Sequence, residues 1–286
     1  GGRSRPMALC DVDYETLSQA LRAYAGTSID RRRADLLEAR LEQIARARGM
    51  SGVTPLIDRL RPPFNEATSD LVDDLVNCET SFFRDAPAFT ALRDFVIPSA
   101  MKKRAEVRRL RVLCAGCSTG QEAYSVAMLV REHFPELSRW SVEITGVDIS
   151  AKRVERAAAG VYSHRELERG VPASFLPKYF QQHNGQLRVI AALRAFTQFR
   201  RANLTESWPG LVGYDIVLLR NLLIYLDDTA KAVMLERAHD ALRTSGYLLL
   251  GSAETVGAAR KAFDRVPYPT YPIYTPHERL KGTARP

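Results

Sequence analysis

The sequence predicts an α/β protein in which a parallel sheet is covered by helices, with a small all-α region before the sheet and a short antiparallel β insert within it. Three observations predict this architecture. Apolar residues at helical spacing, without a strand pattern, fill the chain up to about residue 105. Short apolar runs then alternate with helical segments. An Asn-Gly pair between two short runs interrupts that alternation.

The N-terminal region is predicted to be helical. Apolar residues recur at i, i+4 and i+7 between residues 31 and 48, and a similar spacing is found between residues 69 and 77. Asp85 stands before Ala86-Pro87, a pattern typical of a helix start with a capping carboxylate and Pro in the first turn.

The second part of the chain alternates strands and helices. The predicted strands are short apolar runs over 110–115, 142–147, 196–200, 214–219 and 247–251. The predicted helices lie between them, over 121–133, 151–159 and 228–242. Strands that alternate with helices favour a parallel sheet with both faces covered.

These patterns divide the chain into domains. We expect a helical N-terminal domain and linker over 7–100 and an α/β domain over 101–286, with the boundary in the basic stretch between residues 100 and 110. Within the second domain, 161–200 form the predicted antiparallel insert, because Asn184-Gly185 is a strong signal for a two-residue hairpin turn.

The composition is that of a globular protein. Of 286 residues, 45% are hydrophobic and 26% are charged, which excludes a disordered tail and a fibrous repeat. The net charge of +8 allows nucleic acid, anionic lipid or an acidic protein surface as a partner without choosing among them. No apolar run approaches the roughly 18 residues that a membrane span needs. Four Cys are too few for a disulfide scaffold, so we expect a reducing compartment.

The first Met stands at position 7, behind Gly-Gly-Arg-Ser-Arg-Pro. No apolar signal core follows it, so we expect a cytosolic start at this residue.

A glycine-rich segment, Ala115 to Glu122, follows the first predicted strand and opens a helix. It lacks the Lys-Ser/Thr of a P-loop and is not G-x-G-x-x-G. It does match G-x-S-x-G, which would make Ser118 a hydrolase nucleophile, but only helices precede the strand and no His partner is evident. Cys114 and Cys117 form C-x-x-C; zinc would need a second pair, and a redox pair usually opens a helix.

The segment can also be interpreted as a loop for S-adenosylmethionine. Asp148 ends the second predicted strand, where a carboxylate could accept hydrogen bonds from both ribose hydroxyls. Glu122 could face the methionine ammonium group. The alternative for Asp148 is an ordinary turn residue at the end of a strand.

Four segments together resemble the chemotaxis receptor methyltransferases, the CheR family of protein-glutamate O-methyltransferases. In chain order they are Glu79-Thr-Ser-Phe-Phe-Arg-Asp85, Ala115-Gly-Cys-Ser-Thr-Gly-Gln-Glu122, Arg220-Asn-Leu-Leu-Ile-Tyr225 and Gly246-Tyr-Leu-Leu-Leu-Gly-Ser-Ala-Glu254. The likeness covers nearly the whole chain. It implies a Rossmann-like methyltransferase domain that uses S-adenosylmethionine, yields S-adenosylhomocysteine and needs no metal, and it implies a β-subdomain where we predict the insert.

The resemblance also implies a set of site residues. Thr80 and Arg84 belong to the family's active-site linker, and Arg220 and Tyr225 approach the reacting centre. The residues that would line the S-adenosylmethionine site are Thr80, Arg84, Ala115, Gly116, Glu122, Asp148, Asn203, Leu204 and Asn221. The family usually has Asn before the Glu-Thr pair, and this chain has Cys78.

Several of these residues have structural alternatives. Phe82 and Phe83 fit the core better than a ligand contact, Arg84 could form a surface ion pair, and Tyr225 could be a packed core residue. Glu254 fits a structural role as well as a role in the site.

The residue types suit methyl transfer to a carboxylate. A glutamate acceptor is ionised at neutral pH, because its reference pKa is about 4.3, and no general base is required. Arg84 and Arg220 stay protonated and can orient carboxylates, while Tyr225 can donate one hydrogen bond to aim an oxygen.

The resemblance implies the cytoplasmic signalling domain of chemotaxis receptors as the partner. We expect the protein to act in the cytoplasm, recruited to receptor arrays at the membrane, without direct membrane insertion. On the N-terminal helix, Arg32, Arg40 and Arg46 lie away from the apolar face and could dock onto acidic receptor helices; a solvated face with Glu38 and Glu42 as counterions is the alternative. Some family members hold a receptor-tail pentapeptide through a longer loop, so the short hairpin here predicts that the pentapeptide is not required.

Two other functions stay open. A methyltransferase acting on RNA or a small molecule is compatible with the net positive charge. However, the sequence lacks the alternation of aromatic and basic residues that is typical of RNA-binding proteins, and we expect no nucleic-acid partner. A non-catalytic S-adenosylmethionine-binding module is opposed by the intact Arg84 and Tyr225.

Overall fold

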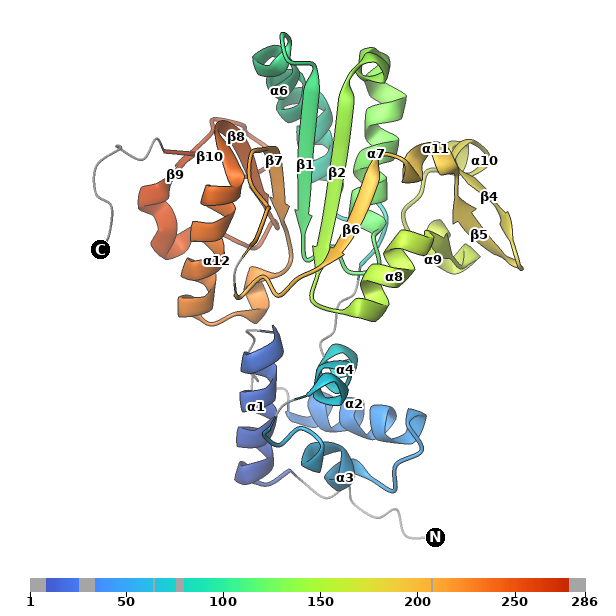
Figure 1. The fold of residues 1–286 in the computed structure, drawn as a ribbon, viewed down its shortest axis with the longest axis vertical. Coiled ribbons are helices and arrows are strands. Elements are labelled where there is room, and N and C mark those ends of the chain that lie inside the picture. The colour runs from blue at the N-terminus through green and yellow to red at the C-terminus, as the bar shows by residue number, and fades with distance from the viewer. Residues whose placement is uncertain (1–8, 26–33, 64, 76–79, 207, 278–286) are drawn as a thin grey trace. The chain divides into compact units, whose positions relative to one another are not determined.

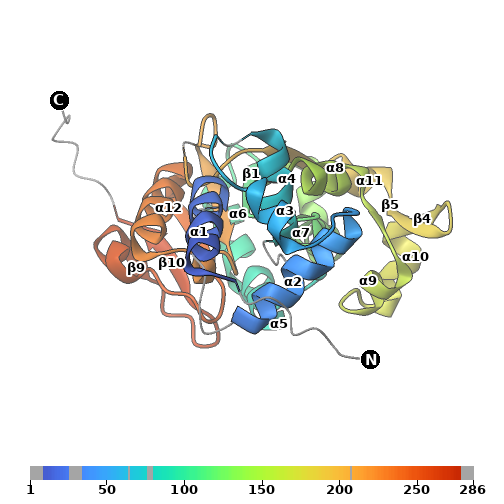
Figure 2. The same cartoon turned by 90° about the horizontal axis from the view of Figure 1, so that it is seen from below.

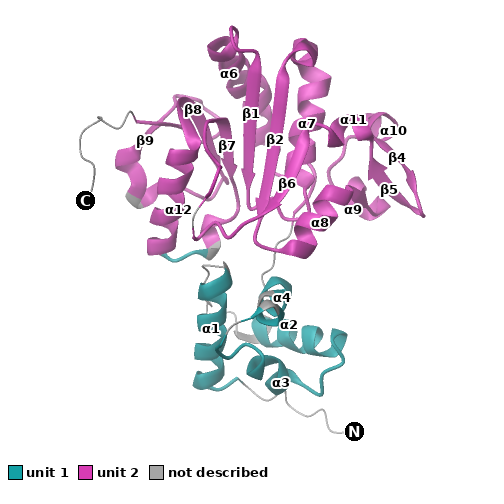
Figure 3. Ribbon diagram, viewed as in Figure 1, with its two compact units in different colours: residues 1–78, 225–227 teal, residues 79–224, 228–286 magenta. Residues whose placement is uncertain are grey.

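The computed structural model describes residues 9–25, 34–63, 65–75, 80–206 and 208–277 (Figure 1). Two compact units divide the chain. The first comprises Gly1–Cys78 with Tyr225–Asp227, and the second comprises Glu79–Ile224 with Asp228–Pro286 (Figure 3). Arg32, Cys78 and Glu79 lie outside the described residues.

The first unit is helical, as its apolar spacing predicts. Its helices are α1 (Asp11–Ala25), α2 (Ala34–Ala47), α3 (Val53–Asp58) and α4 (Glu66–Leu75). Their apolar faces meet in one core, in which Leu17, Leu41 and Leu56 are fully buried. Arg48 supports the packing of α2 on α4, since its Nε lies 2.9 Å from Oδ2 of Asp74.

The segment that follows residue 79 packs in the second unit. It forms α5 (Ala86–Ala91), the π-helical turn η2 (Leu92–Val96) and α6 (Ile97–Arg104). Phe82, Phe89 and Leu92 join the core of that unit. The division between the units therefore falls at residues 78 and 79, whereas the sequence pattern placed it between residues 100 and 110.

Asp85 does not cap α5 as predicted. It stands at the N-cap with φ 69° and its side chain makes no capping hydrogen bond. Its carboxylate instead lies 3.4 Å from Nη2 of Arg220. The reason is that a buried guanidinium competes for this carboxylate, which a local sequence pattern does not reveal.

The second unit contains a seven-stranded sheet in the order β6-β2-β1-β7-β8-β10-β9. The strands are β1 (Arg109–Ala115), β2 (Ser141–Asp148), β6 (Thr197–Arg201), β7 (Tyr214–Leu219), β8 (Leu242–Leu250), β9 (Phe263–Arg265) and β10 (Ile273–Pro276). The five strands from β6 to β8 are parallel, and β10 is antiparallel to both of its neighbours. The five parallel strands are those that the sequence predicts, and the short β9 and β10 were not predicted.

Helices follow the parallel strands as predicted. They are α7 (Gln121–His133), α8 (Ala151–Ala159) and α12 (Asp228–Ala241). Every residue of the central strand β7 is buried, as expected for a strand covered on both faces. Three short 3₁₀ segments complete the connections: η3 (Pro135–Arg139), η5 (Leu223–Tyr225) and η6 (Gly257–Ala262).

The antiparallel insert is present. It contains a three-stranded sheet in the order β3-β5-β4, built from β3 (Val161–Tyr162), β4 (Phe180–His183) and β5 (Gln186–Val189). Short helices complete it: α9 (His164–Glu168), η4 (Ala173–Phe175), α10 (Leu176–Tyr179) and α11 (Ala191–Arg194). The expected insert, 161–200, overlaps the predicted strand 196–200, and residues 197–200 belong to that strand, β6 of the main sheet. In the second unit, β4 and β5 lie on the side opposite to β9 and β10 (Figure 2).

The hairpin of the insert turns at Asn184 and Gly185, as predicted. Both residues have positive φ, 48° and 75°, which suits Asn and Gly in a two-residue turn. In the part of the chain that the structure describes, no helix combines the length and the apolar character needed to cross a membrane.

Candidate functional site

The topology brings the predicted site residues to one edge of the sheet. From β1 the chain adds β2 and β6 on one side of the sheet, and β7 and β8 lie on the other side, so the strand order reverses at β1. Ligands of open α/β sheets bind at such a switch point, beyond the carboxyl ends of the strands. Ala115 ends β1, Asp148 ends β2, and Arg220 directly follows β7.

The glycine-rich loop after β1 is a tight backbone turn. Gly116 and Gly120 have φ values of 78° and 94°, which few other residues adopt. A Cβ on Gly116 would lie 3.0 Å from Cδ2 of Leu222, and one on Gly120 would lie 2.9 Å from Cβ of Ala157. The glycines therefore allow the loop to approach the β7–α12 connection and α8.

Ser118 does not fit the hydrolase alternative. Only 6% of the residue is exposed, whereas a nucleophile elbow presents its Ser to the substrate. Its backbone N–H donates to Oδ2 of Asp148 at 2.8 Å, so this part of the loop is used to hold the end of β2.

Asp148 is buried and oriented by backbone groups. Its Oδ2 accepts from the N–H of Ser118, its Oδ1 accepts from the N–H of Ser150 at 3.1 Å, and Arg153 lies 3.9 Å away. Burial raises the pKa of Asp148, and Arg153 and the N–H donors oppose that rise. Each carboxylate oxygen has a further lone pair, so this side chain can still accept hydrogen bonds from hydroxyl groups.

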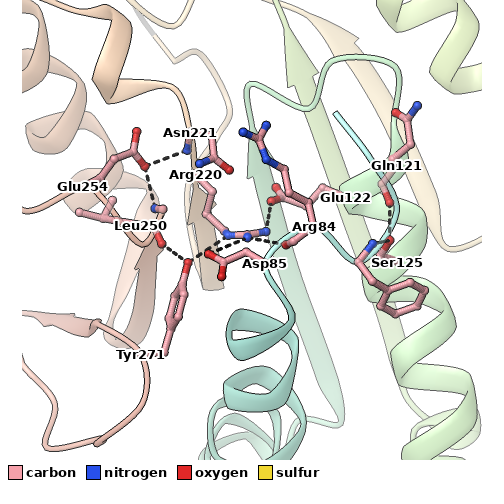
Figure 4. Close-up of polar contacts among 12 residues, drawn as sticks. Arg84, Asp85, Gln121, Glu122, Ser125, Arg220, Asn221, Leu250, Glu254 and Tyr271 are labelled. Carbon is pink, nitrogen blue, oxygen red and sulfur yellow. Dashed lines mark hydrogen bonds and ion pairs between the residues drawn. The ribbon is translucent and has the colours of Figure 1, made fainter. Parts of the chain in front are cut away.

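Arg220 is the centre of a buried polar cluster (Figure 4). Its side chain is 2% exposed. Its Nη1 donates to Oε2 of Glu122 at 2.8 Å, its Nη2 donates to the carbonyl of Arg84 at 2.6 Å, and its Nε donates to the hydroxyl of Tyr271 at 3.2 Å. The guanidinium thus joins the end of β7 to the start of α7, to the segment before α5 and to the segment before β10.

The ionisation of the cluster follows from burial and from these contacts. Burial raises the pKa of Glu122, and Arg220 opposes that rise. Burial also raises the pKa of Tyr271 to about 12, so this hydroxyl keeps its proton at neutral pH and can donate it. It donates to the carbonyl of Leu250 at the end of β8.

Glu254 holds two neighbouring loops together. Its Oε2 accepts from the N–H groups of Gly251 at 2.6 Å and Asn221 at 2.8 Å, and its Oε1 accepts from the N–H of Ile224 at 3.2 Å. The residue is 4% exposed. Of the two roles that the sequence left open for Glu254, these contacts favour the structural one, because the carboxylate orders the backbone next to Asn221.

The loop after β6 carries two more predicted residues. The Asn203 side chain accepts from the backbone N–H of Thr205 at 3.0 Å and donates to Glu206 at 3.1 Å. Leu204 is buried, and its carbonyl accepts from Nε1 of Trp208 at 2.8 Å. Both residues lie at the carboxyl end of β6, beside that of β2.

Three other predicted residues are less fully described. Thr80 is half-buried in the segment before α5, and the Arg84 side chain extends away from the Arg220 guanidinium (Figure 4). Tyr225 ends η5, and its side chain lies outside the described part of the structure.

Phe82 and the cysteines occupy the core. Phe82 is 1% exposed and its ring packs edge-on against Tyr162 and Phe180, with centroids 4.9 and 5.8 Å away, as the core interpretation predicts. Cys114 and Cys117 are buried free thiols, and burial raises the pKa of both well above the ordinary value. Such thiols are poor sources of thiolate, so the pair does not fit a redox site. Among the described residues, no group of three or more His, Cys, Asp or Glu side chains could hold a metal.

Tyr271, Ser125 and the carboxylate of Asp85 also belong to this site, although no sequence motif indicated them. Tyr271 is 51 residues from Arg220 in the chain and belongs to none of the four segments. Ser125 lies one turn beyond the glycine-rich segment, and its hydroxyl contacts the N–H of Phe83 at 2.9 Å. No local pattern indicates either contact.

Comparison with known proteins gives a consistent result. Residues 78–271 match the family described as CheR methyltransferase, SAM binding domain. Chemotaxis protein methyltransferase 1 of Pseudomonas aeruginosa is 31% identical over 255 residues, which cover 87% of this chain and 92% of that protein. Chemotaxis protein methyltransferase of Vibrio parahaemolyticus is 30% identical over 265 residues, and chemotaxis protein methyltransferase 1 of Vibrio cholerae is 31% identical over 268 residues; each match covers 91% of this chain and 95% of the relative.

Proposed function

Since the chain belongs to the CheR family of S-adenosylmethionine-dependent methyltransferases, we propose that it transfers the methyl group to glutamate side chains of chemotaxis receptors, giving glutamyl methyl esters. The observation that carries the acceptor class is the makeup of the site. Arg84, Glu122, Asp148 and Arg220 gather around the ends of β1, β2 and β7, and none of the four predicted segments contains a His that could act as a base. A carboxylate acceptor needs no base, because it is already ionised at neutral pH.

S-adenosylmethionine supplies an electrophilic methyl group, which a carboxylate oxygen attacks in line with the departing sulfur. The residues present suit this cosubstrate. Asp148 offers acceptor lone pairs for the ribose hydroxyls, and the Glu122 carboxylate, whose Oε2 accepts from Arg220, offers a negative charge to the methionine ammonium group. The loops that carry Ala115, Gly116, Asn203, Leu204 and Asn221 would complete the binding site. We propose S-adenosylhomocysteine as the product and no requirement for metal.

Arg84 and Tyr225 are the residues that we propose to contact the acceptor carboxylate. Arg84 supplies a permanent positive charge that can orient it, and Tyr225 supplies a single hydrogen bond. Arg220 was predicted to approach the reacting centre. Its guanidinium is 2% exposed and its three nitrogens donate to protein groups, so we now propose that it acts through the Arg84 segment.

Helix α2 is the proposed docking surface for the receptor. Arg40 and Arg46 are exposed on it, and Arg40 is oriented by the Asp74 carbonyl, 3.0 Å from its Nη2. Glu38, which could have neutralised this face, accepts instead from the N–H of Leu9 at 3.1 Å. These contacts support a face available to acidic receptor helices.

The insert supports the proposal that a receptor-tail pentapeptide is not required. In the hairpin, His183 pairs with Gln186, so the connection between β4 and β5 is reduced to Asn184 and Gly185. A two-residue turn offers no extended loop to hold a peptide. We also propose that the protein acts in the cytoplasm and is recruited to receptor arrays, with no nucleic-acid partner.

The test is methyl transfer from labelled S-adenosylmethionine to native receptor membranes, followed by mild alkaline treatment. Methyl esters release volatile methanol under base, and N-methyl groups do not. We expect base-labile label on the receptor band, and matched membranes without receptors are the control. Base-stable label, or label on RNA or a small molecule, would instead support the alternative that the net charge of +8 leaves open.

A further inference from the structure

We propose that Ser125 and Tyr271 are positioning residues of the methyl-transfer site, which hold Arg84 in place from the two sides of its backbone. The inference rests on the proposed function, in which Arg84 contacts the bound molecules.

The backbone around Arg84 is in an unfavourable conformation. Phe83 and Asp85, its two neighbours, have φ values of 49° and 69°. The left-handed region is costly for residues other than Gly, and a bulky Phe rarely adopts it. Such a segment persists only where its surroundings determine it, so its contacts decide where Arg84 lies.

Ser125 holds the segment on the N-terminal side of Arg84. The N–H of Phe83 donates to Oγ of Ser125 at 2.9 Å, and the Ser125 hydroxyl donates to the carbonyl of Gln121 at 2.7 Å (Figure 4). Because its one proton is used within α7, Ser125 can only accept from Phe83. The residue is fully buried, so water cannot replace it.

Tyr271 holds the segment on the C-terminal side, through Arg220. The Tyr271 hydroxyl donates its one proton to the Leu250 carbonyl, so it can only accept from Nε of Arg220, 3.2 Å away. This contact and the one to Glu122 orient the guanidinium, whose Nη2 then donates to the Arg84 carbonyl at 2.6 Å.

Ser125 and Tyr271 use their hydroxyls in the same way. Each buried hydroxyl is fixed because it donates to a backbone carbonyl of a helix or strand (Figure 4). Its oxygen then accepts a hydrogen bond, from the N–H of Phe83 at Ser125 and from Nε of Arg220 at Tyr271. The position of Arg84 is thereby set by α7 and by the end of β8.

The test is a pair of double-mutant cycles. Ser125→Ala and Tyr271→Phe are each made in the wild-type chain and in Arg84→Ala. Single-turnover methyl transfer and calorimetric affinity for S-adenosylhomocysteine are measured for every variant. We expect each variant to lower the transfer rate about tenfold in the wild-type chain, because a buried donor loses its partner, and to have almost no further effect in Arg84→Ala.

Tyr124→Phe is the matched control. Tyr124 is fully buried on α7 beside Ser125, and its hydroxyl donates to the Ala157 carbonyl at 2.7 Å, away from residues 83–85. Whatever its effect, it should change the rate by the same factor in both backgrounds. Equal factors for Ser125→Ala or Tyr271→Phe in both backgrounds would overturn the proposal, since they would show a general structural role.

Two further measurements keep the test decisive. Thermal unfolding identifies variants that do not fold, and Ser125→Cys, which keeps the shape but weakens the acceptor, then replaces Ser125→Ala with the same expected result. The affinity for S-adenosylhomocysteine can be measured by calorimetry without an acceptor protein. If receptors prove not to be the substrate, the same cycle in binding still supports or overturns the positioning role.

Discussion

Nη1 of Arg220 lies 2.8 Å from Oε2 of Glu122, which joins the end of β7 to the first turn of α7 by a buried ion pair. The side chains are 2% and 16% exposed, respectively. Removal of one partner from such a pair leaves the other charge buried and uncompensated.

Glu122→Ala should therefore destabilise the protein, by about 1–3 kcal/mol because Asp85 still lies 3.4 Å from Arg220, and should weaken S-adenosylmethionine binding at the same time. Denaturant unfolding and calorimetry measure the two effects. The exposed Glu136 on η3 provides a control, since Glu136→Ala should change the free energy of unfolding by no more than about 0.5 kcal/mol. Equal unfolding midpoints for the two variants would show that the Arg220–Glu122 pair makes no net contribution to the free energy of unfolding.

Asp148→Asn should weaken S-adenosylmethionine binding by more than about tenfold, which corresponds to 1.4 kcal/mol. The amide group keeps one acceptor oxygen, but its NH₂ cannot accept from the N–H of Ser118 or from a ribose hydroxyl. Calorimetry checks the affinity, and Asp94→Asn, at a half-exposed carboxylate on η2, is the control. Unchanged affinity in Asp148→Asn would remove this residue from the site.

The insert should show a pH-dependent contribution from Glu166. Burial opposes the ionised form, but hydrogen bonds from Ser163 and the ion pair with Arg156 prevail and lower the pKa of Glu166 below 4.5. The stabilisation by this carboxylate is therefore present above pH 4.5 and is lost as the pH falls through the lowered pKa. Glu166→Gln should cost about 1 kcal/mol at pH 7, with a smaller difference from wild type below pH 4.

Denaturant unfolding at several pH values measures this difference. Glu168, exposed on the same helix, supplies the matched variant Glu168→Gln, for which we expect no comparable pH-dependent loss. A Glu166→Gln deficit that stays constant from pH 7 to pH 3 would contradict an ionised cap.

The pH profile of methyl transfer should report the acceptor. If a glutamate carboxylate attacks directly, the single-turnover rate should increase as the pH is raised through the acidic range, and it should then stay constant from about pH 6 to 9. A base-assisted reaction would instead follow the titration of the base or of an amine acceptor. The plateau should persist in Tyr225→Phe, where slower chemistry limits the rate. A tenfold rise per unit between pH 6 and 8 would exclude a carboxylate acceptor.

Charge reversal on α2 should weaken receptor methylation without changing cosubstrate binding. Arg40→Glu combined with Arg46→Glu would repel acidic receptor helices, while both residues belong to the first compact unit. Wild-type activity should also fall with salt, because exposed charges are screened over about 8–10 Å near physiological ionic strength. Initial rates on receptor membranes test both points, and a salt-independent rate with an active double variant would assign these arginines to a solvated face.

Much of the fold could be predicted because it depends on local patterns. The helices 121–133 and 151–159 and the strand 214–219 have the bounds that apolar spacing indicated. The turn at Asn184-Gly185 was predicted from two residues. The strands β9 and β10 were not, because strands of three and four residues carry too little periodicity to be recognised.

The site was predictable in its positions but not in its contacts. Residues at the ends of strands, such as Asp148, could be expected at one edge of the sheet once the strands were taken as parallel. The role of Arg220 could not, since its partners Glu122, Arg84 and Tyr271 are 98, 136 and 51 residues away in the chain. Likewise, the position of Asp85 before Ala86-Pro87 is typical of a helix cap, yet its carboxylate lies beside Arg220.

Local patterns were enough to indicate the alternation of strands and helices, the turn of the insert and the family to which the chain belongs, because each depends on residues close together in the chain. The folded chain was needed to show that Arg220 is buried, that Glu254 orders the loop at Asn221, and that two hydroxyls hold the strained segment around Arg84. The physical reason is that a buried donor takes whichever acceptor the packed sheet places within reach. That choice depends on the order β7-β8-β10 and on the packing of residues 80–104, which no local pattern contains.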